Sequence, residues 1–82
     1  MRLSMQQSTV PLSVVSSGER VKVSGIAGGA NARKKLLDLG IRPGEMIEVI
    51  SGHKNHPFLV RVGDSRVMIG WGMVEKVLVD RN

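Results

Sequence analysis

The stretch ARKKLLDLGIRPGEMIEVI, residues 32–50, decides the fold because it contains a helix, a stop, a turn and a strand. Asn31 precedes the stretch, and its side chain can accept hydrogen bonds from the first free backbone N–H groups of a helix. Gly40 stands where helices often end on a residue with positive φ, and the apolar Ile41 after it can fold back onto the last turn. We therefore expect a short helix that follows Asn31 as its N-cap and ends at or close to Leu39.

A turn and a strand are expected directly after this helix. Pro43 presets φ for the second position of a turn and Gly44 tolerates the positive φ of the third, so residues 42–45 are typical of a type II turn. Residues 46–50 are apolar and mostly β-branched, with Glu48 in the middle. This pattern predicts a strand in which Ile47 and Val49 face the core and Glu48 between them faces outward.

Four further segments have the composition of short strands, and glycine-containing turns separate them. Gly25 interrupts the first of these, which predicts a bulge or a sharp bend. Five short strands close most economically into a barrel, because a barrel leaves few exposed edges. The prediction is a mainly β fold: a small, partly open SH3-like β-barrel of about five strands, with one short α-helix inserted after the first strand. The expected strands are residues 20–24, 46–50, 58–62, 66–69 and 77–79.

The composition is that of one small domain of 82 residues. Phe58 and Trp71 are its two aromatic residues, so Val, Ile, Leu and Met must build the core. The chain has no cysteine, which excludes disulfides and thiolate metal sites and fits the cytosol. No apolar run approaches the roughly 20 residues that cross a bilayer. A cytoplasmic location is expected.

The ends of the chain are expected to lie outside the domain. Residues 1–11 lack the apolar centre of a secretory signal and are predicted to be a disordered leader. The domain is expected over residues 12–80, and residues 81–82 are expected to form a short tail.

The segment 33–44, RKKLLDLGIRPG, resembles the signature of the ferrous-iron transport protein A family, FeoA. The resemblance continues through residues 47–50, through the hairpin formed by 60–62 and 66–69, and through 75–79. It covers almost the whole of the expected domain, from Leu12 to Val79. The same barrel also occurs as the C-terminal module of iron-dependent repressors, but no DNA-binding helical domain is expected in residues 1–11 ahead of it.

The resemblance implies a cytosolic bacterial accessory protein of ferrous-iron uptake, with an SH3-like barrel and an inserted helix. The implied partner is the membrane transporter FeoB, through its cytosolic G-protein domain or the region beside it. Any association with a membrane would then be peripheral and through that partner. Weak homo-oligomerisation remains open. Two places depart from the family pattern, the loop 52–57 and Trp71, which stands where a basic residue is common.

The formal net charge of +5 raises nucleic acid as an alternative partner, so a small basic nucleic-acid-binding barrel is the second function class considered. The basic residues are spread along the chain and no aromatic residues are interleaved with them for base stacking. The distribution favours a solvated surface, and no nucleic acid is expected as a partner. An enzyme is not expected either, because no nucleophile motif or carboxylate pair with a recognisable spacing is present.

His53 and His56 are the two histidines, three residues apart in a polar loop. They are candidate ligands for ferrous iron, and Asp64 or Glu75 could approach them in space. Two ligands are too few for iron(II), which prefers more nitrogen and oxygen donors, and no carboxylate lies nearby in sequence. The sequence favours solvated loop histidines, and no metal or other cofactor is expected.

The expected partner-binding surface lies on the helix. A short helix buries one face, and three closely spaced leucines cover more than one face, so Leu37 is the candidate for an exposed contact. The neighbouring cations would rim this contact and steer docking to an acidic surface. Trp71 is interpreted more readily as a plug, a side chain that closes one end of the barrel, than as an anchor that binds a partner. The candidate partner-binding residues are Arg33, Lys34, Leu36, Leu37, Arg42 and Trp71.

Overall fold

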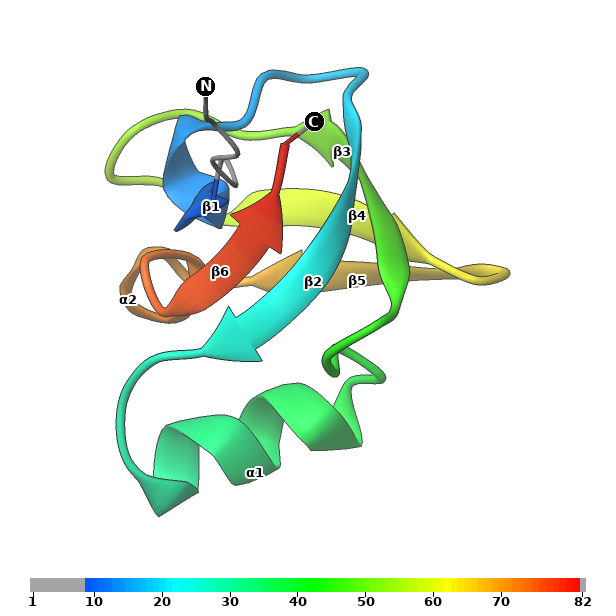
Figure 1. Ribbon diagram of the computed structural model, residues 1–82. Coiled ribbons are helices and arrows are strands. Elements are labelled where there is room, and N and C mark those ends of the chain that lie inside the picture. The colour runs from blue at the N-terminus through cyan, green and yellow to red at the C-terminus, as the bar shows by residue number, and fades with distance from the viewer. Residues whose placement is uncertain (1–8, 82) are drawn as a thin grey trace, which may run out of the picture.

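Alternating apolar and polar residues produce one bent antiparallel sheet in the computed structural model, which describes residues 9–81 (Figure 1). The strands are β1 (Thr9–Pro11), β2 (Arg20–Ile26), β3 (Met46–Ser51), β4 (Phe58–Val62), β5 (Ser65–Ile69) and β6 (Val77–Asp80). The helices are the 3-10 helix η1 (Leu12–Val14), α1 (Ala30–Asp38) and α2 (Trp71–Val74). Hydrogen-bonded neighbours follow the order β1-β6-β2-β3-β4-β5, and all pairs are antiparallel. The mainly β class with a short helix is therefore confirmed.

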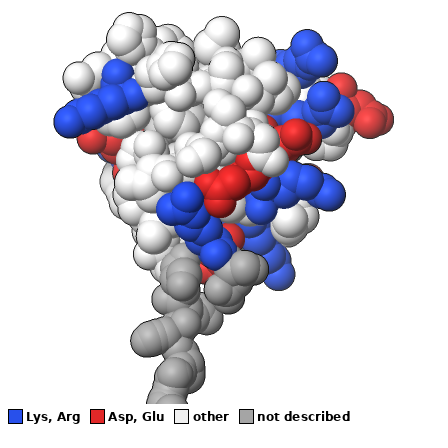
Figure 2. Space-filling model, turned by 90° about the horizontal axis from the view of Figure 1, so that it is seen from above, with Lys and Arg blue, Asp and Glu red and all other residues white. Residues whose placement is uncertain are grey.

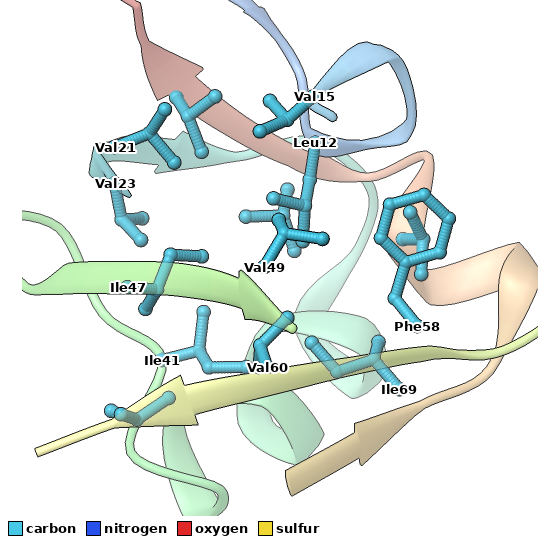
Figure 3. Close-up of a cluster of buried hydrophobic side chains, with 14 of the residues drawn as sticks. Leu12, Val15, Val21, Val23, Ile41, Ile47, Val49, Phe58, Val60 and Ile69 are labelled. Atoms are coloured by element: carbon cyan, nitrogen blue, oxygen red, sulfur yellow. The ribbon is translucent and has the colours of Figure 1, made fainter. Parts of the chain in front are cut away.

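The core lies on the concave side of the sheet and is aliphatic apart from one ring. Alternate strand residues point inward from facing strands and meet there (Figure 3). Phe58 is the largest side chain in this cluster and is buried. The buried residues are Leu12, Val15, Val21, Val23, Leu36, Ile41, Ile47, Val49, Phe58, Val60, Val62, Ile69, Val74, Val77 and Val79.

The first strand, β1, lies where a disordered leader was predicted. Thr9, Val10 and Pro11 pair with Asp80, Val79 and Leu78 of β6, and the Thr9 hydroxyl donates to the Asp80 carboxylate at 3.1 Å. Three residues are too few to show an alternating pattern, so the strand depends on the free edge that β6 offers. The sheet thus has one strand more than expected, and α1 follows the second strand. Residues 1–8 of the predicted leader lie outside the described residues.

The helix α1 begins two residues earlier than predicted, at Ala30. Gly29 occupies the N-cap position in an extended conformation without a side-chain cap, and the Arg33 N–H donates to its carbonyl at 3.1 Å. The interpretation of Asn31 as the N-cap is wrong, because the preceding glycines let the backbone turn into the helix earlier.

The predicted helix stop is present. Gly40 has φ +89°, and its N–H donates to the Leu37 carbonyl at 2.9 Å. The Ile41 N–H donates to the Leu36 carbonyl, also at 2.9 Å. These two bonds form a Schellman motif, and both Leu36 and Ile41 are buried, which places the apolar contact that accompanies this motif inside the core.

The turn after the helix is attached to the sheet. The Glu45 N–H donates to the Arg42 carbonyl at 3.0 Å and Gly44 has φ +94°, as a type II turn requires. The turn also exchanges backbone hydrogen bonds with Val23 of β2, at 2.8 and 2.9 Å. The register between β2 and β6 shifts between Val23 and Gly25, which confirms the predicted bulge.

A clamp joins Glu19, directly before β2, to Arg81 at the C-terminal end of the described chain. The guanidinium of Arg81 donates to both oxygens of Glu19, at 2.9 and 3.1 Å, and the Ser16 N–H donates to the same carboxylate at 2.7 Å. The hydrogen bonds from Arg81, and then that from Ser16, lower the pKa of Glu19 below its usual value of 4.5. These bonds therefore favour the ionised carboxylate in the folded state.

The clamp predicts a pH-dependent stability. Because the folded-state pKa of Glu19 is lowered, its contribution is fully present above about pH 4.5 and is lost as the pH falls through the folded-state pKa. We expect Glu19→Gln to reduce the free energy of unfolding by less at pH 3 than at pH 7, measured by urea unfolding. Glu75→Gln removes the same charge from an exposed position and serves as the control. An equal loss at both pH values for Glu19→Gln would contradict this linkage.

Candidate protein-interaction groove

The leucines of α1 divide between the core and the surface. Leu36 is fully buried, while Leu37 is 43% exposed and Leu39 is 42% exposed. Successive helix residues are rotated by about 100°, so only one of two adjacent leucines can face the sheet. The prediction that Leu36 contacts a partner is wrong, because its side chain belongs to the core. Leu37 is exposed, as expected for a contact residue.

A groove separates α1 from the outer side of β2 and β6. Its volume is about 400 Å³. We call it the helix–sheet groove, and its lining residues are Gly25, Ile26, Arg33, Leu37, Pro43 and Leu78. Most of these residues are apolar, so the groove can accept an aliphatic or aromatic side chain of another molecule.

The sheet side of the groove follows from the bulge in β2. Val77 and Val79 are buried, so Leu78 between them points to the outer side of β6. Gly25 is its partner across the strand pair and carries no side chain to cover it. Ile26 follows and remains partly exposed. Because Gly25 has no side chain, the apolar surface beside it is left open, and this surface continues onto Leu37 of the helix.

The charges around the groove are not equivalent. Arg33 lines it, and among residues 9–81 no carboxylate lies within 4 Å of its guanidinium. Lys34 pairs with Asp38 at 3.6 Å and Arg42 pairs with Glu45 at 3.7 Å, both on the exposed surface. Arg33 is thus the predicted cation best placed to meet a partner's carboxylate, while Lys34 and Arg42 lie outside the lining.

Trp71 does not line the groove. It opens α2 and lies half-buried against the buried ring of Phe58, with the ring centroids 6.1 Å apart. Such packing is the arrangement expected of a plug. The structure therefore does not bring Trp71 together with the predicted contact residues of α1, and its role as a partner-binding residue stays a prediction.

The two histidines lie in the exposed loop between β3 and β4. Their ring centroids are 6.3 Å apart, and Nδ1 of His56 lies 3.0 Å from the Lys54 carbonyl oxygen. Within the described part of the chain, no group of three or more His, Cys, Asp or Glu residues could hold a metal ion. The geometry adds no third ligand to His53 and His56.

Sequence reasoning missed four of the six lining residues of the groove, Gly25 among them. Ile26, Pro43 and Leu78 come from three separate segments, and none of them stood out as a functional residue. One signal was available, because Leu78 is apolar at an outward position between two inward valines.

No helix in the described range is long and apolar enough to cross a membrane.

Comparison with known protein families gives one match over nearly the whole described chain. The FeoA domain matches residues 10–81. A curated relative from Methanocaldococcus jannaschii, named as an Fe(2+) transport protein A, is 33% identical over 70 residues. That alignment covers 85% of this chain and 84% of the relative.

Solved structures agree with this match. An iron uptake regulatory protein (FeoA) has a TM-score of 0.83 at 40% identity, covering 88% of this chain and 96% of its own. The FeoA of Stenotrophomonas maltophilia, described as a prokaryotic SH3 domain protein complexed with zinc, has a TM-score of 0.75 at 25% identity, covering 87% and 89%. The IdeR of T. acidophilum shares the fold, with a TM-score of 0.83 at 16% identity, but this chain covers only 37% of it. The predicted SH3-like fold is confirmed.

Proposed function

This chain belongs to the FeoA family, and on that premise we propose that it binds the cytosolic part of the FeoB transporter through the helix–sheet groove. As a member of the family it is a non-enzymatic accessory protein associated with ferrous-iron transport. Its place of action in this proposal is the cytoplasm, where it modulates the transporter by binding. The proposal names a partner and a surface for that accessory role.

The single observation that carries the proposal is an uncovered apolar groove beside Arg33, a cation that forms no ion pair within residues 9–81. Leu37, Ile26 and Leu78 would each lose water-exposed apolar area on contact with a partner. Burying such area stabilises a complex by roughly 25 cal/mol per Å² before the costs of association. Arg33 at the rim adds orientation, because a guanidinium can bind a carboxylate in a defined geometry. A partner segment with an apolar anchor and a nearby acidic residue fits these features.

The nucleic-acid alternative gains no support from the fold. Base stacking needs accessible aromatic faces, and this chain has one phenylalanine, one tryptophan and no tyrosine. Phe58 is buried and Trp71 is half-buried against it. No specific observation favours this second function.

Leu37→Glu tests the proposal. The substitution places a carboxylate in the apolar lining, so we expect binding to the purified cytosolic domain of the cognate FeoB to weaken at least about tenfold. Binding can be measured by biolayer interferometry with the transporter domain immobilised. The fold should persist, since surface substitutions usually change stability by no more than about 0.5 kcal/mol.

Leu39→Glu is the matched control for this experiment. It introduces the same charge on a leucine of nearly the same exposure that does not line the groove. We expect it to change the affinity by less than about twofold. Equal losses for both variants would place the contact elsewhere on the helix. Absence of binding by the wild-type protein would overturn the proposed partner itself.

A further inference from the structure

A row of charged residues crosses the outer face of the sheet, on the side opposite the core. The register places Arg20 of β2 opposite Glu48 of β3, Glu48 opposite Arg61 of β4, and Arg61 opposite Arg66 of β5. Residues directly opposite in antiparallel strands point to the same side of a sheet. Their neighbours along the strands face the core, so all four side chains face outward. We call Arg20, Arg61 and Arg66 the arginine row.

The charges within the arginine row are not balanced. Arg61 reaches the single carboxylate, Glu48, at 3.9 Å, which is a long and solvent-exposed contact. For Arg20 and Arg66 no ion pair is present among residues 9–81. Arg61 and Arg66 stand directly opposite one another, and like charges in that position destabilise a strand pair. An anionic surface outside the protein would remove this repulsion.

Two exposed methionines lie on the same outer face. Met68 of β5 is 61% exposed and Met46 of β3 is 44% exposed. Met46 is the cross-strand partner of Lys22, which has Asp80 of β6 opposite it on its other side, so these two charges balance one another. Methionine is unbranched and flexible, so its side chain can enter an irregular apolar environment. The face therefore combines several cations with apolar side chains that have no cover in the described structure.

The charges are arranged across a surface rather than around one point. Neighbouring strands are about 4.8 Å apart, so the row from β2 to β5 extends over several such spacings. In the view of Figure 2, Lys, Arg, Asp and Glu gather mainly on one side, and much of the remaining surface is uncharged. No aromatic residue stands on the outward positions of β2 to β5, which argues against base stacking there.

We propose that this outer face binds directly to a membrane surface that carries anionic phospholipids. The guanidinium groups would contact phosphate-bearing headgroups, and Met46 and Met68 would enter the apolar boundary beneath them. This goes beyond the family role, and it departs from the expectation that membrane association occurs only through the transporter. The groove and the arginine row share no lining residue, so the protein could contact a transporter and the surrounding lipid together.

Vesicle co-sedimentation tests this inference without any transporter, so its failure leaves the transporter proposal untouched. We expect the full-length protein to sediment with phosphatidylcholine vesicles containing about 30% phosphatidylglycerol, and not with pure phosphatidylcholine vesicles. Binding should weaken as salt is raised from about 0.02 M to about 0.15 M, because screening increases over that range. Equal binding to both vesicle types, or none to either at low salt, would overturn the inference.

Two double variants of equal net charge locate the surface. Arg61→Gln with Arg66→Gln should weaken binding to the anionic vesicles by about 25-fold, at roughly fivefold per basic residue near the lipid. Lys34→Gln with Lys35→Gln on α1 should weaken it by less than about fivefold. Arg61→Lys with Arg66→Lys keeps the charge and should retain binding, which controls for changes in folding. Equal losses for the two glutamine doubles would refute a lipid-binding face. So would tighter binding of the wild-type protein to generic single-stranded RNA than to the vesicles at the same salt, if Arg61→Gln with Arg66→Gln abolished that RNA binding.

Discussion

Leu36→Ala is expected to lower the free energy of unfolding by about 2–5 kcal/mol. Leu36 is fully buried and is the one residue of α1 that the core contains. Its carbonyl also accepts the Ile41 N–H in the helix stop, so a cavity here would loosen the contact that holds the helix to the sheet. A domain of this size has a total stability of only about 5–10 kcal/mol, and the variant would therefore be marginally folded. Urea unfolding followed by circular dichroism measures the change.

Leu37→Ala is the matched control for the core position. The same three carbon atoms are removed from the adjacent residue, but that side chain is 43% exposed, so a loss of less than about 1 kcal/mol is expected. The pair separates a residue that stabilises the fold from one available for a partner. Similar losses at both positions would mean that Leu37 packs as closely as Leu36, and the groove could not then be an open binding surface.

Gly52→Ala is expected to destabilise the protein by about 3 kcal/mol, although glycine to alanine is the smallest change that adds a side chain. A Cβ at Gly52 would lie 2.5 Å from two carbon atoms of the Phe58 ring. The ring is buried in the core and cannot move aside without displacing its neighbours. A shift of about 4–8 °C in the thermal midpoint accompanies each kcal/mol in a domain of this length, so a large drop is expected in a thermal melt.

Gly72→Ala is the matched control for this second prediction. No atom lies within 4 Å of a Cβ built at Gly72, which is in α2, so alanine there should be neutral or slightly stabilising. An unchanged midpoint for Gly52→Ala would show that the ring has room to move.

Local signals in the sequence were sufficient for the best-predicted part of the fold. The stop at Gly40, the turn at Pro43 and Gly44, and the strand after it depend on residues that are close together in the chain. Positive φ at glycine and fixed φ at proline are backbone properties, so they could be recognised without knowledge of the partners. The strand β1 had no such signal, because its three residues form a strand only by pairing with the edge of β6.

The candidate site was predicted less completely, because it depends on which side of each element is covered. The leucines at 36 and 37 differ by one position, and periodicity alone did not separate the buried one from the exposed one. Arg33 and Leu37 were predicted as contact residues and both line the groove, whereas Lys34, Arg42 and Trp71 do not. Gly25, Ile26 and Leu78 join them only through the pairing of β2 with β6.

The sequence by itself determined the class of fold, the position of the helix stop and turn, and the family resemblance of residues 33–44. Each of these depends on neighbours within a few residues, where backbone geometry and side-chain type act directly. Only the tertiary structure decided which leucine is core, how the helix–sheet groove is formed, and that three arginines align across four strands. Those features depend on strand register and on the rotation of α1 against the sheet, which join residues far apart in the chain.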